Sequence, residues 1–376
     1  MRIAILKERR TGETRVAATP ETVKKFVTAG HDVAIEKGAG LAAAVTDDAF
    51  SDAGATIGTA AATLKGADAL FGVHAPDDAT LAKLKGMLLV CHLEPHGATG
   101  KAEALAKGGI DALAMEFVPR ITRAQAMDAL SSQANLAGYR SVIEAAQIYG
   151  RAFPMMMTAA GTVAPAKVFV MGAGVAGLQA IATARRLGAV VSATDVRPAA
   201  KEQVASLGAK FVAVEDEEFR EAETAGGYAK EMSKEYQAKQ AELIASHIAK
   251  QDVVVTTALI PGRPAPKLVT KAMVESMKPG SVVIDLAAPN GGNCKLTRAD
   301  EIVEHKGVKV AGYANLPGRL AADSSALYAK NLANLLPLLV DEEGKKAPHW
   351  DDEIIQGMAL TKDGKVVHPS LTKEEA

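Results

Sequence analysis

The chain has 376 residues, of which 48% are hydrophobic and 23% charged, the ordinary mixture of a globular protein. Lysine and arginine number 43 against 44 aspartates and glutamates, so the formal net charge is −1, which argues against a dedicated nucleic-acid binder. The first residues, MRIAILKERR, contain no apolar segment typical of a signal peptide, and the longest uncharged stretch, residues 168–184, is interrupted by three glycines. We therefore expect neither a secretion signal nor a membrane span.

Apolar runs alternate with helical patterns from the N-terminus to about residue 119, which is typical of a parallel sheet covered by helices. A helix is expected over residues 20–27, beginning at a proline and ending near Gly30. The predicted strands are residues 2–6, 32–36, 69–73, 87–91 and 112–116. This region of the chain is expected to form a first α/β domain.

The two cysteines, Cys91 and Cys294, are far apart and form no CxxC pair, which fits a reducing compartment. His92 and His96 lie four residues apart beside Cys91, the one arrangement that could indicate a metal. Pro95 interrupts any helix that would bring both imidazoles to one face, and no third ligand is nearby. We expect no metal site.

Residues 122–149 are predicted to form one long helix. Apolar or small residues recur along it at the spacing of a buried stripe: Met127, Leu130, Ala134, Ala137 and Ser141. Such a helix between two sheet-forming regions indicates a connector between domains.

A second α/β run follows, with strands predicted at residues 168–171, 190–194, 211–214, 253–256, 282–285 and 308–311. The methionines at 155–157, just before it, are expected to fill a core or a domain interface. A final apolar helix is predicted over 328–340, able to pack back on the first domain. The tail from residue 341 carries 14 charges in 36 residues and is expected to be a loosely packed arm.

Together these patterns predict an α/β protein of two doubly wound, Rossmann-like domains with parallel sheets, joined by a long helix. The first domain is expected to span residues 1–125, completed by the C-terminal segment 320–376. The second is expected to span residues 126–319 and to include the connector helix.

The strongest local signal is a strand, a glycine turn and a helix over residues 168–178. Its glycines fit the GxGxxG pattern: Gly172 makes the tight turn, Gly174 lets the backbone approach a pyrophosphate, and Gly177 permits close helix–strand packing. The free N–H groups at the helix N-terminus then favour phosphate. The alternative is a packing turn that binds no ligand.

An acidic residue stands where a dinucleotide fold places its ribose ligand. Asp195 follows the strand at 190–194 and lies 18 residues beyond Gly177. A carboxylate there accepts hydrogen bonds from ribose hydroxyls and repels a 2′-phosphate, so NAD(H) is favoured over NADP(H). Arg197 weakens this argument only slightly.

Five segments make the chain resemble the alanine dehydrogenase and proton-translocating transhydrogenase superfamily. The first two are residues 7–20, with Lys7-Glu8 and ETRVAATP, and the fingerprint from Gly172 to Asp195. The other three, residues 120–139, 224–230 and 256–262, resemble the NAD(H)-binding component of the transhydrogenase in particular. The resemblance extends to about residue 337, and only the tail is uninformative.

The resemblance implies a nucleotide site in a cleft and assigns residues to it. Arg120, Asp128 and Ser131 would hold the nicotinamide end, Gln125 would sit between two nicotinamides, and Tyr228 would belong to a loop that closes on the nucleotide. The adenine and ribose side would be lined by Val175, Asp195, Val196, Arg197, Gly227, Gln240 and Leu259.

The residue types agree with hydride transfer between two nicotinamides, because that reaction moves no proton to or from the substrate. It needs positioning and exclusion of water but no general base. The side chains at 120, 125, 128 and 131 can supply hydrogen bonds to a carboxamide. Without the resemblance, a surface ion pair of Arg120 with Asp128 and a solvated Gln125 would be the simpler interpretation.

Alanine dehydrogenase is the main alternative. Its reaction needs a base and groups that hold a carboxylate. The lysine that this family has after the third strand is aligned with Gly72 here, and an aspartate before a Gly-Gly pair is aligned with Pro289, whereas Arg15 and His92 are retained. A third hypothesis is an NAD(H) sensor that binds nucleotide without catalysis.

The resemblance also implies partners. The chain has one GxGxxG pattern and no membrane span, so NADP(H) binding and proton translocation would reside on other, membrane-spanning and NADP(H)-binding subunits. The chain would be a peripheral homodimer on the cytoplasmic face of the inner (plasma) membrane.

Overall fold

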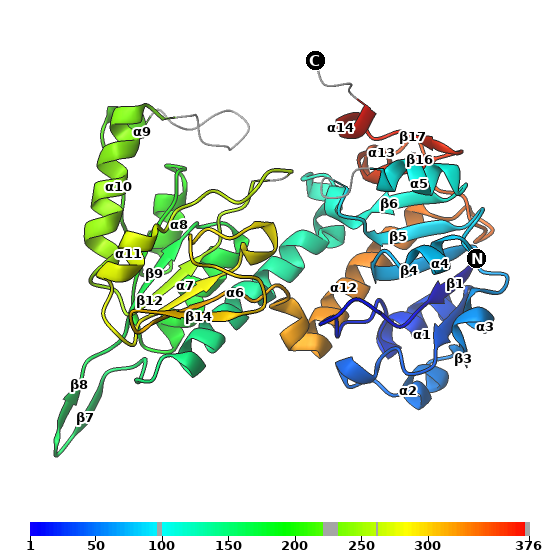
Figure 1. Cartoon of the computed structure of the whole chain (residues 1–376). Helices are drawn as coiled ribbons and strands as arrows, with labels where there is room; N and C mark the ends of the chain where they lie inside the picture. Colours follow the sequence, from blue (N-terminus) through cyan, green and yellow to red (C-terminus); the bar gives the residue numbers. More distant parts are fainter. Residues whose placement is uncertain (96–99, 221–231, 261, 373–376) are drawn as a thin grey trace. The chain divides into compact units, whose positions relative to one another are not determined.

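The computed structural model describes residues 1–95, 100–220, 232–260 and 262–372 (Figure 1). The chain forms two units, each with its own sheet and core: Met1–Gln133 with Pro317–Ala376 make unit 1, and Ala134–Leu316 make unit 2. The expected boundaries, 125/126 and 319/320, lie close to these limits. Each unit combines a largely parallel sheet with helices, so the predicted α/β fold class is confirmed.

Unit 1 is built on an eight-stranded sheet of order β17-β16-β6-β5-β4-β1-β2-β3. The strands from β3 to β6 are parallel, whereas β16 and β17 join antiparallel. Chain order reverses between β1 and β4. The strands are β1 (Arg2–Ile5), β2 (Asp32–Glu36), β3 (Thr56–Gly58), β4 (Ala69–His74), β5 (Leu88–His92), β6 (Asp111–Ala114), β16 (Ala359–Lys362) and β17 (Lys365–Val366).

Helices cover both faces of this sheet, because alternate strand residues are apolar on each side. One face packs Ile3 and Phe71 against α1, α2, α12 and α13, and the other packs Ala4 and Leu89 against α3 and α5. The helices of unit 1 are α1 (Pro20–Thr28), α2 (Asp47–Asp52), α3 (Ala60–Leu64), α4 (Asp78–Leu81), α5 (Lys101–Lys107), α12 (Ala321–Leu335), α13 (Glu353–Met358) and α14 (Pro369–Thr372).

The expected first helix forms for local reasons. Thr19 accepts a hydrogen bond from the Thr22 backbone N–H, the Thr22 side chain returns the bond, and Pro20 occupies the first turn. Val23 and Phe26 then fall on one buried face. Burying one face of a short helix stabilises it more than its intrinsic propensity does.

The C-terminal tail is not the loose arm expected from its charge. Ile354, Ile355 and Met358 of α13 are buried in the unit 1 core, and β16 pairs antiparallel with β6. Asp352 caps α13 and forms an ion pair with Arg123. The charged residues alternate with apolar ones that find partners far away in the sequence.

The final helix also begins earlier than expected, at Ala321, and ends at Leu335. Tyr328 is fully buried, and its hydroxyl donates to the Gly72 carbonyl oxygen at 2.8 Å. Leu332 and Leu335 join the same core. The segment after residue 317 is therefore an integral component of unit 1.

Unit 2 has a seven-stranded sheet of order β11-β10-β9-β12-β13-β15-β14, parallel except for β14. Chain order reverses between β9 and β12. The strands are β9 (Lys167–Met171), β10 (Val190–Thr194), β11 (Lys210–Phe211), β12 (Val253–Thr256), β13 (Val282–Asp285), β14 (Ile302–His305) and β15 (Val308–Ala311). The strand expected over 211–214 is the two-residue edge strand β11.

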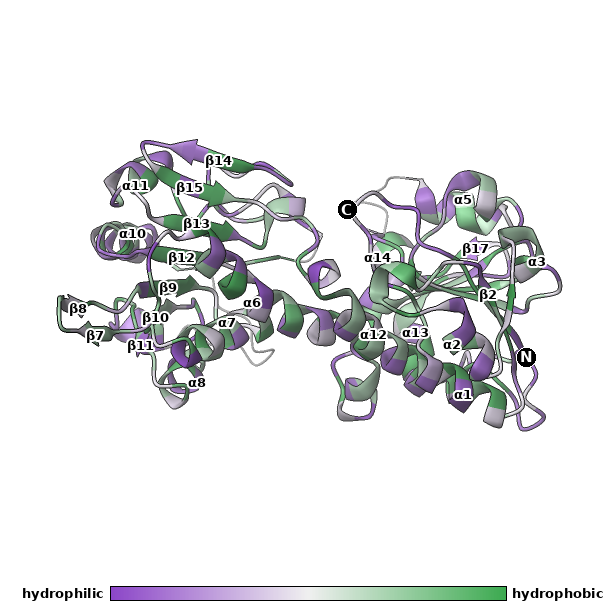
Figure 2. Ribbon diagram, turned by 90° about the horizontal axis from the view of Figure 1, so that it is seen from below, coloured by the Kyte–Doolittle hydropathy of each residue, from purple (hydrophilic) through white to green (hydrophobic). Residues whose placement is uncertain are grey.

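The central strands of unit 2 are apolar and covered on both sides (Figure 2). Side chains of α6, α7 and α8 pack on one face, and those of α10 and α11 pack on the other. The helices are α6 (Ala129–Ile148), whose first residues belong to unit 1, α7 (Val175–Arg186), α8 (Ala200–Ser206), α9 (Glu217–Arg220), α10 (Lys234–Ile248) and α11 (Lys271–Ser276).

The single helix expected over 122–149 is divided in two. Residues Thr122–Met127 form a 3₁₀ helix, η3, and α6 begins at Ala129. The break falls at Asp128, whose carboxylate accepts hydrogen bonds from the Ser131 backbone N–H and hydroxyl. Aspartate favours this capping role over a place inside a helix.

The methionines at 155–157 are not buried, contrary to expectation. They lead into a two-stranded hairpin of β7 (Met156–Thr158) and β8 (Gly161–Val163), which projects from the body of unit 2 (Figure 1). Its strands pair only with each other, so no second layer covers them. Met157 is 78% exposed.

Within the described ranges, no helix combines the length and apolar character that crossing a membrane requires.

Candidate functional site

The glycine loop of unit 2 has the conformation that the sequence pattern predicts. It leaves β9 at Gly172, whose φ of +105° favours glycine, and Gly174 precedes the first turn of α7. A Cβ added to Gly174 would meet no atom within 4 Å. The first N–H groups of α7 therefore face open space, as a phosphate site requires.

Gly177 holds α7 close to the loop. A Cβ at this position would lie 1.8 Å from the Gly172 carbonyl oxygen, far inside contact distance. Gly138 of α6 is a second close approach, because its Cβ would lie 2.0 Å from the Ala176 carbonyl oxygen. The sequence pattern identified the first of these glycines but not the second.

The loop lies at the carboxyl edge of the sheet, where the chain order reverses between β9 and β12. Thr257, just after β12, donates its hydroxyl to the Gly172 carbonyl oxygen at 3.1 Å. In doubly wound sheets this switch point is the usual ligand site. Thr257 is a supporting residue that the sequence analysis missed, although its place directly after an apolar strand was a usable signal.

Asp195 lies at the end of β10, and its carboxylate already has several partners. Oδ2 accepts from the Ala173 backbone N–H at 2.7 Å, and Oδ1 accepts from the backbone N–H and Nε of Arg197, both at 2.9 Å. The carboxylate is thus bonded to the glycine loop itself. The structure brings Asp195, Arg197 and the loop together.

Three of the apolar residues predicted for the adenosine side are exposed: Val175, Val196 and Leu259. They come from the start of α7, the end of β10 and the segment after β12, all at the carboxyl edge of the sheet. Exposed apolar side chains beside a polar loop suit the flat face of a base.

Gln240 of α10 is held within unit 2. Its Oε1 accepts from the Val214 backbone N–H at 2.8 Å, and its Nε2 donates to the Thr194 hydroxyl at 3.3 Å. It therefore ties α10 to the end of β10. The remaining predicted residues on this side, Gly227 and Tyr228, lie outside the described residues.

The residues predicted for the nicotinamide end belong to unit 1. Arg120 and Gln125 are exposed, and Gln125 lies on η3. Asp128 and Ser131 are bonded to each other at the start of α6, with an Oγ–Oδ2 distance of 2.5 Å. The same cap that begins α6 thus places these two side chains after the segment that carries Gln125.

A buried ionic cluster in unit 1 was not anticipated. The Arg15 guanidinium donates to both Glu13 oxygens, at 2.8 and 2.7 Å, and to Gln133 Oε1 at 2.8 Å. His74 Nε2 lies 2.9 Å from Glu13 Oε2. Burial alone would raise the pKa of Glu13, but hydrogen bonds from Arg15 and His74 bring it well below its ordinary value.

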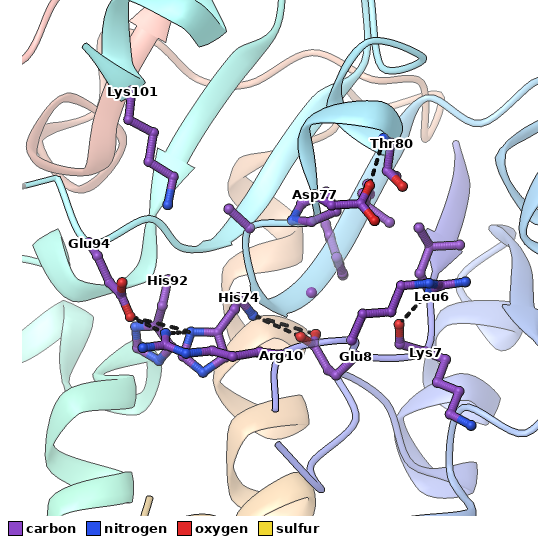
Figure 3. A pocket seen from close by; sticks show the side chains of 16 residues that line it. Leu6, Lys7, Glu8, Arg10, His74, Asp77, Thr80, His92, Glu94 and Lys101 are labelled. Atoms are coloured by element: carbon purple, nitrogen blue, oxygen red, sulfur yellow. Dashed lines mark hydrogen bonds and ion pairs between the residues drawn. The ribbon is translucent and has the colours of Figure 1, made fainter. Parts of the chain in front are cut away.

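Beside this cluster, unit 1 has a cavity of about 400 Å³ (Figure 3). It lies at the carboxyl ends of β1, β4 and β5, beside the point where the chain order reverses, and Glu8, His74, His92 and Lys101 are among its lining residues. Burial raises the pKa of Glu8 to about 7.

Gly72, the position aligned with the lysine of alanine dehydrogenase, also lines this cavity. Its Cβ would lie 3.0 Å from the His74 carbonyl oxygen and 3.5 Å from Glu8 Oε1. His96, considered above as a metal ligand, lies outside the described residues. Among the described residues, no group of three or more His, Cys, Asp or Glu side chains could hold a metal ion.

Comparison with known proteins matches both halves of the chain to family models. Residues 4–137 match "Alanine dehydrogenase/PNT, N-terminal domain" and residues 141–369 match "Alanine dehydrogenase/PNT, C-terminal domain". The chain is 56% identical to the first of the separate portions of the NAD(P) transhydrogenase alpha subunit of Rhodospirillum rubrum, over the whole of both proteins.

Two solved structures have the same fold. A transhydrogenase structure from Sinorhizobium meliloti matches with a TM-score of 0.89 and 54% identity, covering 98% of this chain and all of that one. An L-alanine dehydrogenase matches with a TM-score of 0.83 and 25% identity, covering 98% of both chains.

Proposed function

The chain belongs to the alanine dehydrogenase/PNT family, and from this premise we propose that it is the NAD(H)-binding component of a proton-translocating transhydrogenase. The observation that carries the proposal is the open glycine loop bonded to Asp195, on a chain similar along its full length to a transhydrogenase alpha subunit. When bound, NADH would supply a hydride for direct transfer to NADP⁺ held by a partner.

The residues at the loop suit a dinucleotide. Gly174 leaves room for a pyrophosphate at the start of α7, and Asp195 can accept hydrogen bonds from ribose hydroxyls with oxygen lone pairs left over from its present partners. Val196 and Leu259 offer apolar contacts to the adenine. We assign Gly172, Gly177, Val175, Arg197, Gly227 and Gln240 to the same site.

The nicotinamide end is assigned to Arg120, Gln125, Asp128 and Ser131, with Tyr228 closing on the nucleotide. Because Asp128 and Ser131 are bonded to each other, we propose that they act as one unit that presents hydrogen-bond groups to the carboxamide. The exposed Gln125 would lie between the two nicotinamides. None of these groups has to act as a general base, which fits a direct hydride transfer.

The buried cluster of unit 1 weighs against alanine dehydrogenase. A substrate carboxylate would have to compete with Glu13 for the Arg15 guanidinium, which is only 6% exposed. A buried, bidentate ion pair of this kind is costly to break. In addition, Gly72 and Pro289 stand at the aligned positions of the missing lysine and aspartate.

We propose that the partners are membrane-spanning and NADP(H)-binding subunits, and that the chain docks on them at the cytoplasmic face of the inner (plasma) membrane. We also propose a homodimer. The exposed methionines of the β7–β8 hairpin support self-association, since a projecting apolar hairpin is more stable when another surface covers it.

Two experiments with the chain alone test this proposal. Calorimetric titration with NADH should show binding, and Asp195→Ala should weaken it. A mixture of the chain, NADH, pyruvate and ammonia should show no oxidation of NADH. Absence of NADH binding would contradict the proposed function, and oxidation of NADH in this mixture would establish an amino-acid dehydrogenase instead.

A further inference from the structure

The carboxylate assigned to the ribose is also one half of an ion pair. Arg197 Nε lies 2.9 Å from Asp195 Oδ1, and a terminal nitrogen lies 3.1 Å from Oδ2. The Asp195 side chain is 8% exposed and the Arg197 side chain 33%. The pair is bidentate and partly shielded from water, so its geometry is better defined than that of an ordinary surface ion pair.

Arg197 is also attached to the glycine loop. A terminal nitrogen donates to the Ala173 carbonyl oxygen at 3.2 Å, while the Ala173 backbone N–H donates to Asp195. The guanidinium therefore lies beside the same loop as the carboxylate. Any group that approaches Asp195 also meets a positive charge only a few ångströms away.

This positive charge changes how NADP(H) would be rejected. An acidic residue at the end of the second strand usually repels the 2′-phosphate, which carries a charge of about −2 near neutral pH. Two opposite charges at similar distances from a third charge nearly cancel. With Arg197 paired to it, Asp195 offers little net repulsion.

We propose, on the basis of the NAD(H) site proposed above, that Arg197 is a specificity-determining residue that reduces the discrimination against NADP(H). NADP(H) would be disfavoured here mainly because Asp195 needs ribose hydroxyls as hydrogen-bond donors, and a 2′-phosphate offers none at that position. Its negative charge, balanced by Arg197, would contribute less.

The test compares the dissociation constants of NADH and NADPH in the full-length chain by calorimetric titration. Arg197→Gln should raise the ratio of the NADPH constant to the NADH constant by about tenfold or more, because Asp195 loses its counter-charge. Arg197→Lys keeps the charge and should leave the ratio within about threefold of the wild-type value. The opposite change, Asp195→Asn, should lower the ratio and make the expected direction testable even if Arg197→Gln fails to fold.

Lys201→Gln is the matched control. Lys201 lies on α8 and pairs with Glu215, so its replacement removes one positive charge from the same unit without touching Asp195. It should change the ratio by less than about twofold. Raising the salt concentration should also reduce the effect of Arg197→Gln, because salt screens charge effects.

The outcomes separate this inference from the proposed function. If the wild-type chain binds neither nucleotide, the proposed function fails. If NADH binds but the ratio stays within about twofold in Arg197→Gln and Asp195→Asn, the pair only stabilises the loop and the inference is overturned.

Discussion

Two glycines of the same loop should affect stability and nucleotide binding separately. Alanine inside a helix normally stabilises it by about 1 kcal/mol relative to glycine. In Gly177→Ala, however, the new Cβ would lie 1.8 Å from the Gly172 carbonyl oxygen, so α7 must move away from the loop. Overpacking costs about 1–3 kcal/mol, and the upper value applies because a backbone atom cannot rotate away.

The net expectation for Gly177→Ala is a loss of about 2 kcal/mol in the free energy of unfolding. For a unit of this size, that corresponds to a fall in Tm of about 4–8 °C. Gly174→Ala is the matched control, because its φ is −74° and its Cβ would meet no atom within 4 Å. Its stability should change by less than about 1 kcal/mol.

The two variants should behave in the opposite way toward nucleotide. The Cβ in Gly174→Ala occupies the space where a pyrophosphate would approach α7, so the affinity for NADH should fall by about tenfold or more. Scanning calorimetry without nucleotide and titration with NADH at a temperature where both variants are folded measure the two effects. A Tm of Gly177→Ala at or above the wild-type value, or unchanged NADH affinity in Gly174→Ala, would refute this reasoning.

Three further predictions concern other regions of the chain. Because burial raises the pKa of Glu8 from 4.5 to about 7, the folded state holds a proton that the unfolded state releases between these values, and stability falls as the pH rises through that range. The Tm of Glu8→Gln minus that of the wild type should therefore increase from about pH 5 to about pH 8, and a constant difference would contradict it. Gln125→Asn should slow hydride transfer to a partner's NADP⁺ far more than it weakens NADH binding; equal losses would make Gln125 a binding residue only. Met157→Asp should weaken self-association in sedimentation experiments, and an unchanged oligomer would exclude the hairpin from the interface.

The central strands and the glycine loop could be predicted because their signals are local. The runs at 168–171, 253–256 and 282–285 are uniformly apolar, and each is buried on both faces of a parallel sheet. The spacing from Gly172 to Asp195 likewise reflects one strand–helix–strand unit.

The C-terminal segment could not be predicted in the same way. Ile354, Ile355 and Met358 are separated from most of the core by hundreds of residues of chain, and β16 requires β6 as its partner. The charges between them dominated the local pattern. The break at Asp128, by contrast, had a local signal, because an aspartate followed three residues later by a serine favours the start of a helix.

In the candidate site, sequence reasoning identified residue types but not their partners. Arg15 reaches His74 and Gln133, 59 and 118 residues away, and such contacts depend on the whole sheet. The pairing of Asp195 with Arg197 was closer at hand, since the two are separated by one residue. Its two-point contact became evident only from the way both side chains meet the glycine loop.

The most direct test of the central claim is hydride transfer from NADH to the nucleotide held by a transhydrogenase NADP(H)-binding domain, measured with and without this chain. The proposed function predicts turnover only when both proteins are present, and a rate that falls strongly in Gln125→Asn. A rate that does not depend on the added chain, although the chain binds NADH, would contradict it.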